Sequence, residues 1–128
     1  MAVGTVTFTH DRAGGFGRIV ATCTASSTDG TFPATDIPVF AGELLTLHTN
    51  PGAVQPQDDW DVTLVDDGSV DRLQGLGANR DTLNSELAHI VYSGTAIHPA
   101  CVNEKLTLTV AGNNVNSAVI VITLTYQL

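Results

Sequence analysis

Six side chains in this sequence belong to the types that bind transition metals: His10, His48, His89, His98, Cys23 and Cys101. A zinc site needs ligands at short spacings, so that one strand or helix presents two of them on the same side. No two of the six residues have such a spacing, and even His98 and Cys101 would need further ligands from distant segments. We therefore predict no metal site and expect Cys23 and Cys101 to be buried free thiols. A disulfide between them, formed after release from the cell, is the alternative.

A run of aspartates could instead bind calcium, which takes several carboxylate oxygens. The run consists of Asp58, Asp59, Asp61, Asp66, Asp67 and Asp71. The segment 66–71 has a glycine turn, but it lacks the alternating ligands and the terminal glutamate of a calcium loop. We predict a solvated turn whose aspartates bond to their own backbone, with calcium binding as the alternative.

The remaining motifs that suggest chemistry are weaker. The segment Gly75-Leu76-Gly77-Ala78-Asn79-Arg80 is glycine-rich like a dinucleotide loop, but it follows turn residues and no βαβ unit surrounds it. No serine lies in a Gly-x-Ser-x-Gly context. Asp59 and Asp61 would point the same way on a strand, where outward carboxylates are usually solvated. The sequence therefore predicts no catalytic residue and no cofactor, and we expect that the protein is not an enzyme.

The charge balance excludes further classes of function. Thirteen acidic residues oppose five basic ones, for a net charge of −8, and the arginines are scattered singly. A protein that binds nucleic acid needs clustered Lys and Arg, so we expect no nucleic-acid partner. The longest apolar run, 118–122, is far shorter than the roughly 20 residues of a membrane span, so we expect no membrane segment. The N-terminus has no secretion signal, which predicts synthesis in the cytoplasm.

The elements that would position any site are strands. The apolar content of 43% with 14% charged residues predicts a folded chain, and we expect one domain over residues 1–128. Frequent threonine and valine favour strands, and alternation of polar and apolar residues predicts them at 3–9, 16–25, 39–48, 60–65, 105–110 and 117–126. We expect the first two strands to form one hairpin and the last two to form another. A short helix is predicted over 82–89, and loops over 26–36 and 49–59.

These elements predict an all-β fold, a single antiparallel β-sandwich domain like a jelly roll with at most one short helix. Trp60 is the expected core anchor because an indole buries a large area. The last strand is apolar on both faces at its start, since Val119 and Val121 lie opposite Ile120 and Ile122. Such a strand is covered on both sides, so it is either central in a sandwich or part of a subunit interface.

Three segments of the chain resemble small β-rich virion proteins of tailed bacteriophages. They are 73–81 (LQGLGANRD), 88–94 (AHIVYSG) and 106–113 (LTLTVAGN), within a likeness that extends from Trp60 to the C-terminus. The resemblance implies a structural virion protein, a capsid decoration (cement) protein that stabilises the head by binding between subunits of the major capsid protein. It would be made in the host cytoplasm and lie on the capsid surface. A neck, tail-attachment or fibre protein and a carbohydrate-binding β-sandwich module are the alternatives.

A cement protein binds many equivalent sites on a shell, so a closed homo-oligomer is expected, and local three-fold positions favour a trimer. We expect its contacts on the N-terminal segment, on the long loops and on the last strand. The residues predicted to bind the partner are Val3, Val6, Phe8, Phe32, Ile37, Val54, Val119 and Val121. The carbohydrate alternative needs exposed aromatic rings, whereas Trp60, Tyr92 and Tyr126 lie in strand-like segments where burial is expected.

Overall fold

The computed structural model of the chain describes residues 3–37, 41–90, 100–102 and 104–127. Those residues form nine strands and no helix. The strands are β1 (Thr5–Ala13), β2 (Phe16–Thr24), β3 (Thr35–Ile37), β4 (Gly42–Pro51), β5 (Asp61–Val65), β6 (Glu86–His89), β7 (Ala100–Val102), β8 (Leu106–Ala111) and β9 (Val119–Gln127). No helix in these segments could cross a membrane.

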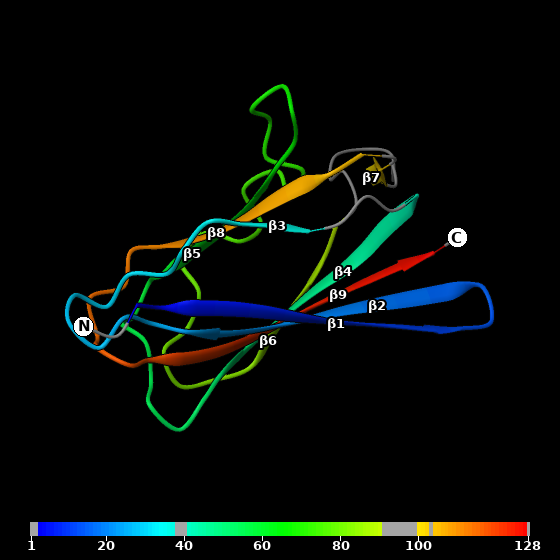
Figure 1. Cartoon of the computed structure of the whole chain (residues 1–128). Coiled ribbons are helices and arrows are strands. Elements are labelled where there is room, and N and C mark those ends of the chain that lie inside the picture. The colour runs from blue at the N-terminus through cyan, green and yellow to red at the C-terminus, as the bar shows by residue number, and fades with distance from the viewer. Residues whose placement is uncertain (1–2, 38–40, 91–99, 103, 128) are drawn as a thin grey trace.

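The strands form two antiparallel sheets packed as a sandwich, which confirms the predicted fold class (Figure 1). The larger sheet has six strands in the order β1-β2-β9-β4-β6, with β7 also paired to β4. The smaller sheet has three strands in the order β3-β8-β5. Strands β1 and β3 each lie at one edge of their sheet, and Figure 1 shows these two edges on the same side of the sandwich.

The predicted N-terminal hairpin is confirmed, and it is longer than expected. Strands β1 and β2 pair in one unbroken register from Thr5 opposite Thr24 to Ala13 opposite Phe16. Only Gly14 and Gly15 form the turn, and Gly14 has a φ of 62°, as the first central residue of a type II′ turn requires.

Strand β9 is central in its sheet, which is one of the two placements that its apolar faces predicted, and only its inner face is covered by described residues. It lies between β2 and β4, and Ile120, Ile122, Leu124 and Tyr126 point into the core. The core also contains Trp60, which is fully buried, and this confirms it as the anchor. Its indole N–H donates to the Asp81 carbonyl at 3.2 Å, so burial leaves no polar atom of the ring unsatisfied.

The predicted C-terminal hairpin is wrong. Strand β8 lies between β3 and β5 in the smaller sheet, whereas β9 lies in the larger one. The connection between them crosses from sheet to sheet, and the side chain of Asn113 holds it there. The Asn113 amide N–H donates to the Gly30 carbonyl at 2.7 Å, and its amide oxygen accepts from the Gln57 backbone N–H at 2.8 Å. Both strands alternate in the same way, so their pattern is equally compatible with facing strands and with paired ones.

The predicted helix over 82–89 is also wrong, because residues 86–89 form strand β6 against β4. The local signal is real: Asp81 Oδ1 accepts from the backbone N–H groups of Leu83 and Asn84, as a helix cap does. Leu83 and Leu87, however, are 62% and 58% exposed. Apolar packing therefore would not stabilise a helix over these residues. The backbone of 86–89 instead forms its hydrogen bonds with the edge of β4.

The remaining boundaries differ in smaller ways. The loop predicted at 26–36 contains the start of β3, which pairs with β8. The strand predicted at 39–48 corresponds to β4. Among the described residues it begins at Gly42, and it continues to Pro51, beyond its predicted end. Its backbone shifts register against β9 between Leu44 and Thr46.

Candidate functional site

Four of the aspartates considered as calcium ligands accept hydrogen bonds from the backbone of the chain itself: Asp58, Asp61, Asp66 and Asp71. Asp71 Oδ1 accepts from the backbone N–H groups of Leu64 and Leu73, both at 3.0 Å, and its Oδ2 accepts from Gly75 at 3.1 Å. This carboxylate therefore joins strand β5 to the turns that follow it. That arrangement agrees with the predicted role of these aspartates as turn residues.

Asp66 likewise binds backbone N–H groups, at the start of the turns that follow β5. Its Oδ1 accepts from the backbone N–H groups of Gly68 and Val70 at 2.9 Å, and its Oδ2 accepts from Arg72 Nε at 2.8 Å. The hydrogen bond from Arg72 is the main reason that the pKa of Asp66 lies below its usual value. Within the described ranges, no three His, Cys, Asp or Glu side chains come together in a group that could hold a metal ion.

The histidines are dispersed over the larger sheet. His10 Nε2 and the Tyr126 hydroxyl form a hydrogen bond, and the two rings meet edge to face at 5.6 Å between centroids. His48 and His89 lie on β4 and β6, on the sheet face that points away from the core. The fourth histidine, His98, lies outside the described residues.

Cys23 is a free, buried thiol on β2, as predicted. Burial raises its pKa to about 12, so the thiol is protonated at neutral pH and is a poor nucleophile. The side chain of Cys101 lies outside the described residues.

The glycine-rich segment 75–80 packs along β5 and does not form a ligand loop. The Val62 backbone N–H donates to the Gly77 carbonyl at 2.9 Å, and Arg80 N–H donates to the Trp60 carbonyl at 2.7 Å. A Cβ at Gly77 would lie 2.1 Å from the Val62 carbonyl oxygen, so only glycine fits this close approach.

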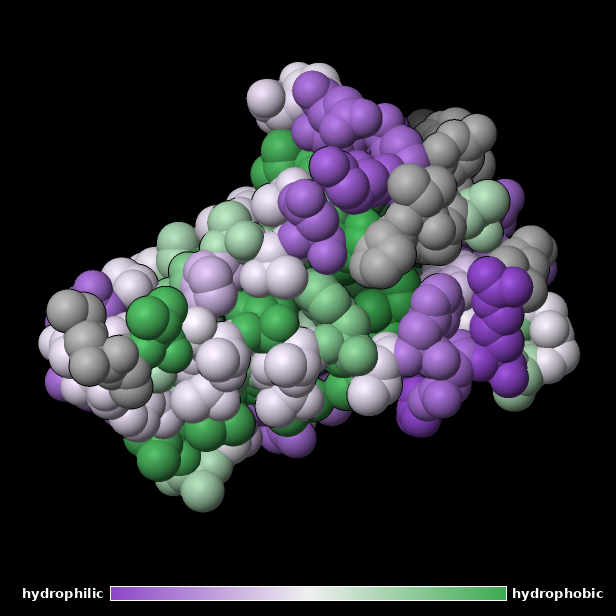
Figure 2. Space-filling model, viewed as in Figure 1, coloured by the Kyte–Doolittle hydropathy of each residue, from purple (hydrophilic) through white to green (hydrophobic). Residues whose placement is uncertain are grey.

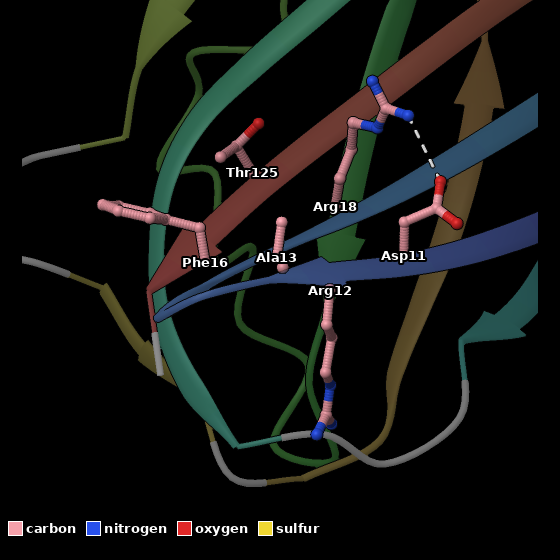
Figure 3. Close-up of a pocket in the computed structure, with 7 residues that line it drawn as sticks. Asp11, Arg12, Ala13, Phe16, Arg18 and Thr125 are labelled. Atoms are coloured by element: carbon pink, nitrogen blue, oxygen red, sulfur yellow. Dashed lines mark hydrogen bonds and ion pairs between the residues drawn. The ribbon is translucent and has the colours of Figure 1, made fainter.

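A shallow hollow of about 340 Å³ lies at the tip of the β1–β2 hairpin (Figure 3). Figure 3 shows Asp11, Phe16 and Arg18 on one side of the hairpin and Arg12 on the other. The one acidic side chain of the hollow is already paired, because Arg18 donates to Asp11 at 3.2 Å. Phe16 is 51% exposed at its rim. The hollow thus offers a contact for a neighbouring molecule and no acid–base pair for catalysis.

A second candidate surface is the outer face of the six-stranded sheet. Register places the outward residues of β1, β2, β9 and β4 side by side across this face, as in Thr7 opposite Thr22 and Thr22 opposite Val121. We name it the threonine face. Its uncharged β-branched members are Thr5, Thr7, Thr9, Val20, Thr22, Thr24, Thr46, Val119, Val121, Thr123 and Thr125.

Charge is nearly absent from the threonine face. Its only charged members are Asp11, Arg18 and Glu43, which lie together at the end of the sheet near the hairpin tip. Most of the acidic residues lie on the smaller sheet and the loops around it. Figure 2 shows strongly hydrophilic residues gathered above β3 and β8 and at the hairpin end of β1, with a paler band over the rest of β1. The chain is therefore acidic on one side and close to neutral on the other.

The residues predicted to bind a partner fall into four environments. Val3 and Val54 are 74% and 43% exposed. Val119 and Val121 are half-buried on the threonine face. Val6 and Phe8 are half-buried on the inner side of edge strand β1. Phe32 and Ile37 are buried in the core. The two core side chains are covered by this chain itself and contribute no surface.

The prediction overlooked the threonines that make up most of the threonine face. Their signal was present as alternate positions, for example Thr5, Thr7 and Thr9. A strand with outward threonines is also what solvent exposure produces. Only the sheet order shows that several such strands lie next to one another.

No protein-family model matches the sequence, and no curated protein matches it. Among solved structures, a chain of the cyanophage Pam1 capsid asymmetric unit is similar, with 21% sequence identity and a TM-score of 0.38. The alignment covers 98% of this chain and 86% of that chain. This TM-score is too low to establish a shared fold, and we base no inference on it.

Proposed function

We propose that the chain is a structural protein of a tailed-phage particle, a decoration protein that binds the assembled shell of major capsid protein through its threonine face. The resemblance of segments 73–81, 88–94 and 106–113 to phage virion proteins supports the class of protein. The threonine face supports the mode of action, and it is the observation on which the proposal rests.

A neutral, β-branched surface suits a contact that excludes water. Charged residues are depleted from the centre of protein interfaces, because removing a charge from water costs more than the contact returns. Short threonine and valine side chains also have little rotamer freedom to lose when a partner covers them. Thr22 and Val121, at the centre of the face, combine both properties.

The size of the face also fits. Strands about 4.8 Å apart with about 3.3 Å per residue give this face an area on the order of 600 Å². A specific protein interface covers about 800 Å² of each partner, so the face with its rim is sufficient. Its acidic side would then point to solvent, where like charges on neighbouring copies keep particles apart.

Other classes of partner have less support. Trp60 and Tyr126 are fully buried, so neither offers the exposed ring that a sugar platform uses. The basic side chains of Arg72, Arg80 and Lys105 are paired with carboxylates at 2.8, 3.8 and 3.4 Å, which leaves them poorly placed to bind phosphates. The carboxylates of the 66–75 region hold backbone N–H groups, a structural role that supports a protein without catalysis.

Co-sedimentation with assembled shells tests the proposal, using purified wild-type chain and three single variants. Thr22→Glu and Thr22→Lys place opposite charges at the centre of the threonine face. Thr109→Glu is the matched control, because Thr109 is an outward threonine in the middle of β8, on the other sheet. We expect both Thr22 variants to bind shells at least about tenfold more weakly, since a buried unpaired charge costs at least ~2 kcal/mol, and Thr109→Glu to bind as wild type.

Each outcome has a distinct meaning. If wild-type chain does not sediment with shells, the decoration role is rejected, and binding to purified necks or tails would then favour the attachment alternative. If the chain binds but Thr22→Glu and Thr22→Lys bind as well as wild type, the contact lies elsewhere. If the two Thr22 variants change binding in opposite directions, long-range charge and not a dry contact determines affinity.

A further inference from the structure

Strand β1 has an exposed edge. It is nine residues long and pairs with β2 on one side and with no other described strand. Its register is continuous, and the strand contains no proline and no lysine. Bulges, prolines and lysines are among the features that protect a long edge in natural sheets, because unpaired N–H and C=O groups readily bind another strand. Strand β1 has none of these three, and its charged residues are confined to Asp11 and Arg12 near the turn.

The hairpin turn fixes which backbone groups are free on this edge. In a two-residue hairpin the residues that flank the turn, here Ala13 and Phe16, exchange hydrogen bonds with each other. The bonded positions then alternate along the strand. Odd-numbered residues of β1 therefore bond to β2, whereas Val6, Phe8, His10 and Arg12 direct their backbone N–H and C=O groups outward.

We propose that two copies of this chain associate through β1, with the strands antiparallel about a two-fold axis at Thr9. In this register Phe8 of each copy lies opposite His10 of the other, and Val6 lies opposite Arg12. The four residues of each copy whose backbone groups are free thus pair with those of the other copy. Each pair exchanges two hydrogen bonds, which gives about eight backbone hydrogen bonds in all. The whole length of β1 is used.

The side chains on the inner side of β1 are complementary in this register. Val6 and Phe8 are half-buried and pack against the core. In the dimer the His10 ring of the second copy lies beside Phe8, and the aliphatic stem of Arg12 covers Val6. Arg12 forms no ion pair with any residue that the structure describes, so its side chain can adopt this position.

The charges also permit self-association. Asp11 and Arg12 are the only charged residues of β1, and together they carry no net charge. On the outer side Thr7 faces Asp11 of the second copy, so a hydroxyl meets a carboxylate and no like charges lie opposite each other. A chain with a net charge of −8 would therefore dimerise through one of its least acidic surfaces.

The edge also distinguishes this dimer from the trimer expected from shell symmetry. A ring that continued the sheet would place β1 beside the opposite edge strand, β6, which has four residues. Neighbouring strands in this sheet are antiparallel, so β1 and β6 run in the same direction and their pairing in such a ring would be parallel. The two-fold pairing is antiparallel and involves nine residues of each copy, which makes it the better use of the edge.

Light scattering and sedimentation over a range of protein concentrations test this proposal without shells, so the result does not depend on the proposed function. We expect wild-type chain to have twice the monomer mass of 13.4 kDa. At the two-fold axis the two Thr9 Cα atoms would be about 4.5 Å apart. Thr9→Glu should therefore weaken the dimer about fivefold, because two carboxylates would face each other. Thr22→Glu, one strand inside the sheet, is the matched control and should remain a dimer.

A mixture sharpens the test. Thr9→Glu and Thr9→Lys should each dimerise more weakly than wild type when alone, and mixed together they should preferentially form a heterodimer that ion exchange separates from both parents. Circular dichroism of each variant shows whether it is folded. A wild-type monomer or trimer would overturn the proposal, and so would a dimer of folded Thr9→Glu that is as stable as wild type.

Discussion

Gly17→Ala is expected to destabilise the protein, because the Tyr126 ring occupies the space that a methyl group would need. A Cβ at Gly17 would lie 2.1 Å from Cζ, 2.4 Å from the hydroxyl oxygen and 2.5 Å from Cε1 of the ring. The ring cannot move away freely, because Gly42 lies against it too, where a Cβ would be 2.8 Å from Cδ2. Tyr126 is fully buried and also bonds to His10, so its position is held from several directions.

The size and sign of the effect distinguish this contact from strand propensity. Forcing a methyl group into a packed site costs about 1–3 kcal/mol, and confinement by two glycines places Gly17→Ala near the upper end. Without the contact, the same substitution in a strand would stabilise by about 0.5–1 kcal/mol, because glycine has more conformational freedom to lose. In a domain of this size the expected loss lowers Tm by roughly 10 °C.

A double-mutant cycle with Tyr126→Leu isolates the contact. Leucine lacks Cζ, Cε1 and the hydroxyl, so in that background Gly17→Ala should become neutral or stabilising, with a coupling energy of about 2–3 kcal/mol. Urea unfolding followed by the fluorescence of Trp60, the only tryptophan, measures all four proteins. Additive effects, or a stabilising Gly17→Ala in the wild-type background, would refute the reasoning.

Three further predictions concern the loop, the thiol and the core. The pKa of Asp66 is lowered chiefly by Arg72, so this carboxylate contributes stability above its unfolded pKa of about 4, and that stability is lost as the pH falls through its lower folded pKa. Asp66→Asn should abolish that part of the acid dependence in a pH series of urea unfolding, and an unchanged series would contradict it. In a Cys101→Ser variant, Cys23 should resist a thiol-specific reagent at neutral pH until denaturant unfolds the chain, and prompt labelling would show that the thiol is accessible. Trp60→Ala should cost about 3–5 kcal/mol in urea unfolding monitored by circular dichroism, and a loss below ~1 kcal/mol would mean that the indole is not the core anchor.

Much of the local structure could be read from the residues. Alternation identified the inward side chains of the strands, and the first two strands were correctly predicted to form a hairpin. The structure shows that Gly14 and Gly15 alone form its turn, because a two-residue turn needs the positive φ that glycine permits. The candidate surface was predicted only in part. Val119 and Val121 were expected to be exposed to a partner, and they lie on the threonine face. The threonines were not identified, because an outward threonine on one strand is typical of solvent exposure.

The errors share one physical cause. The 82–89 segment has both a cap at Asp81 and near-helical spacing of leucines, yet it extends along β4, because a sheet edge distant in sequence satisfies its backbone. The predicted pairing of 105–110 with 117–126 failed for the same reason. Strand β8 found its neighbours in β3 and β5, and β9 found its neighbours in β2 and β4. In both cases distant segments outweighed the local signal.

The sequence by itself determined which side of each strand faces the core, because side chains alternate with a period of two along any extended chain. It also determined the acidic charge and the burial of the indole. Only the tertiary structure decided which strands are neighbours, since alternation is satisfied by any partner that covers the apolar side. That choice of neighbours assembled scattered threonines into one neutral face, left the edge of β1 open and enclosed Tyr126 between two glycines.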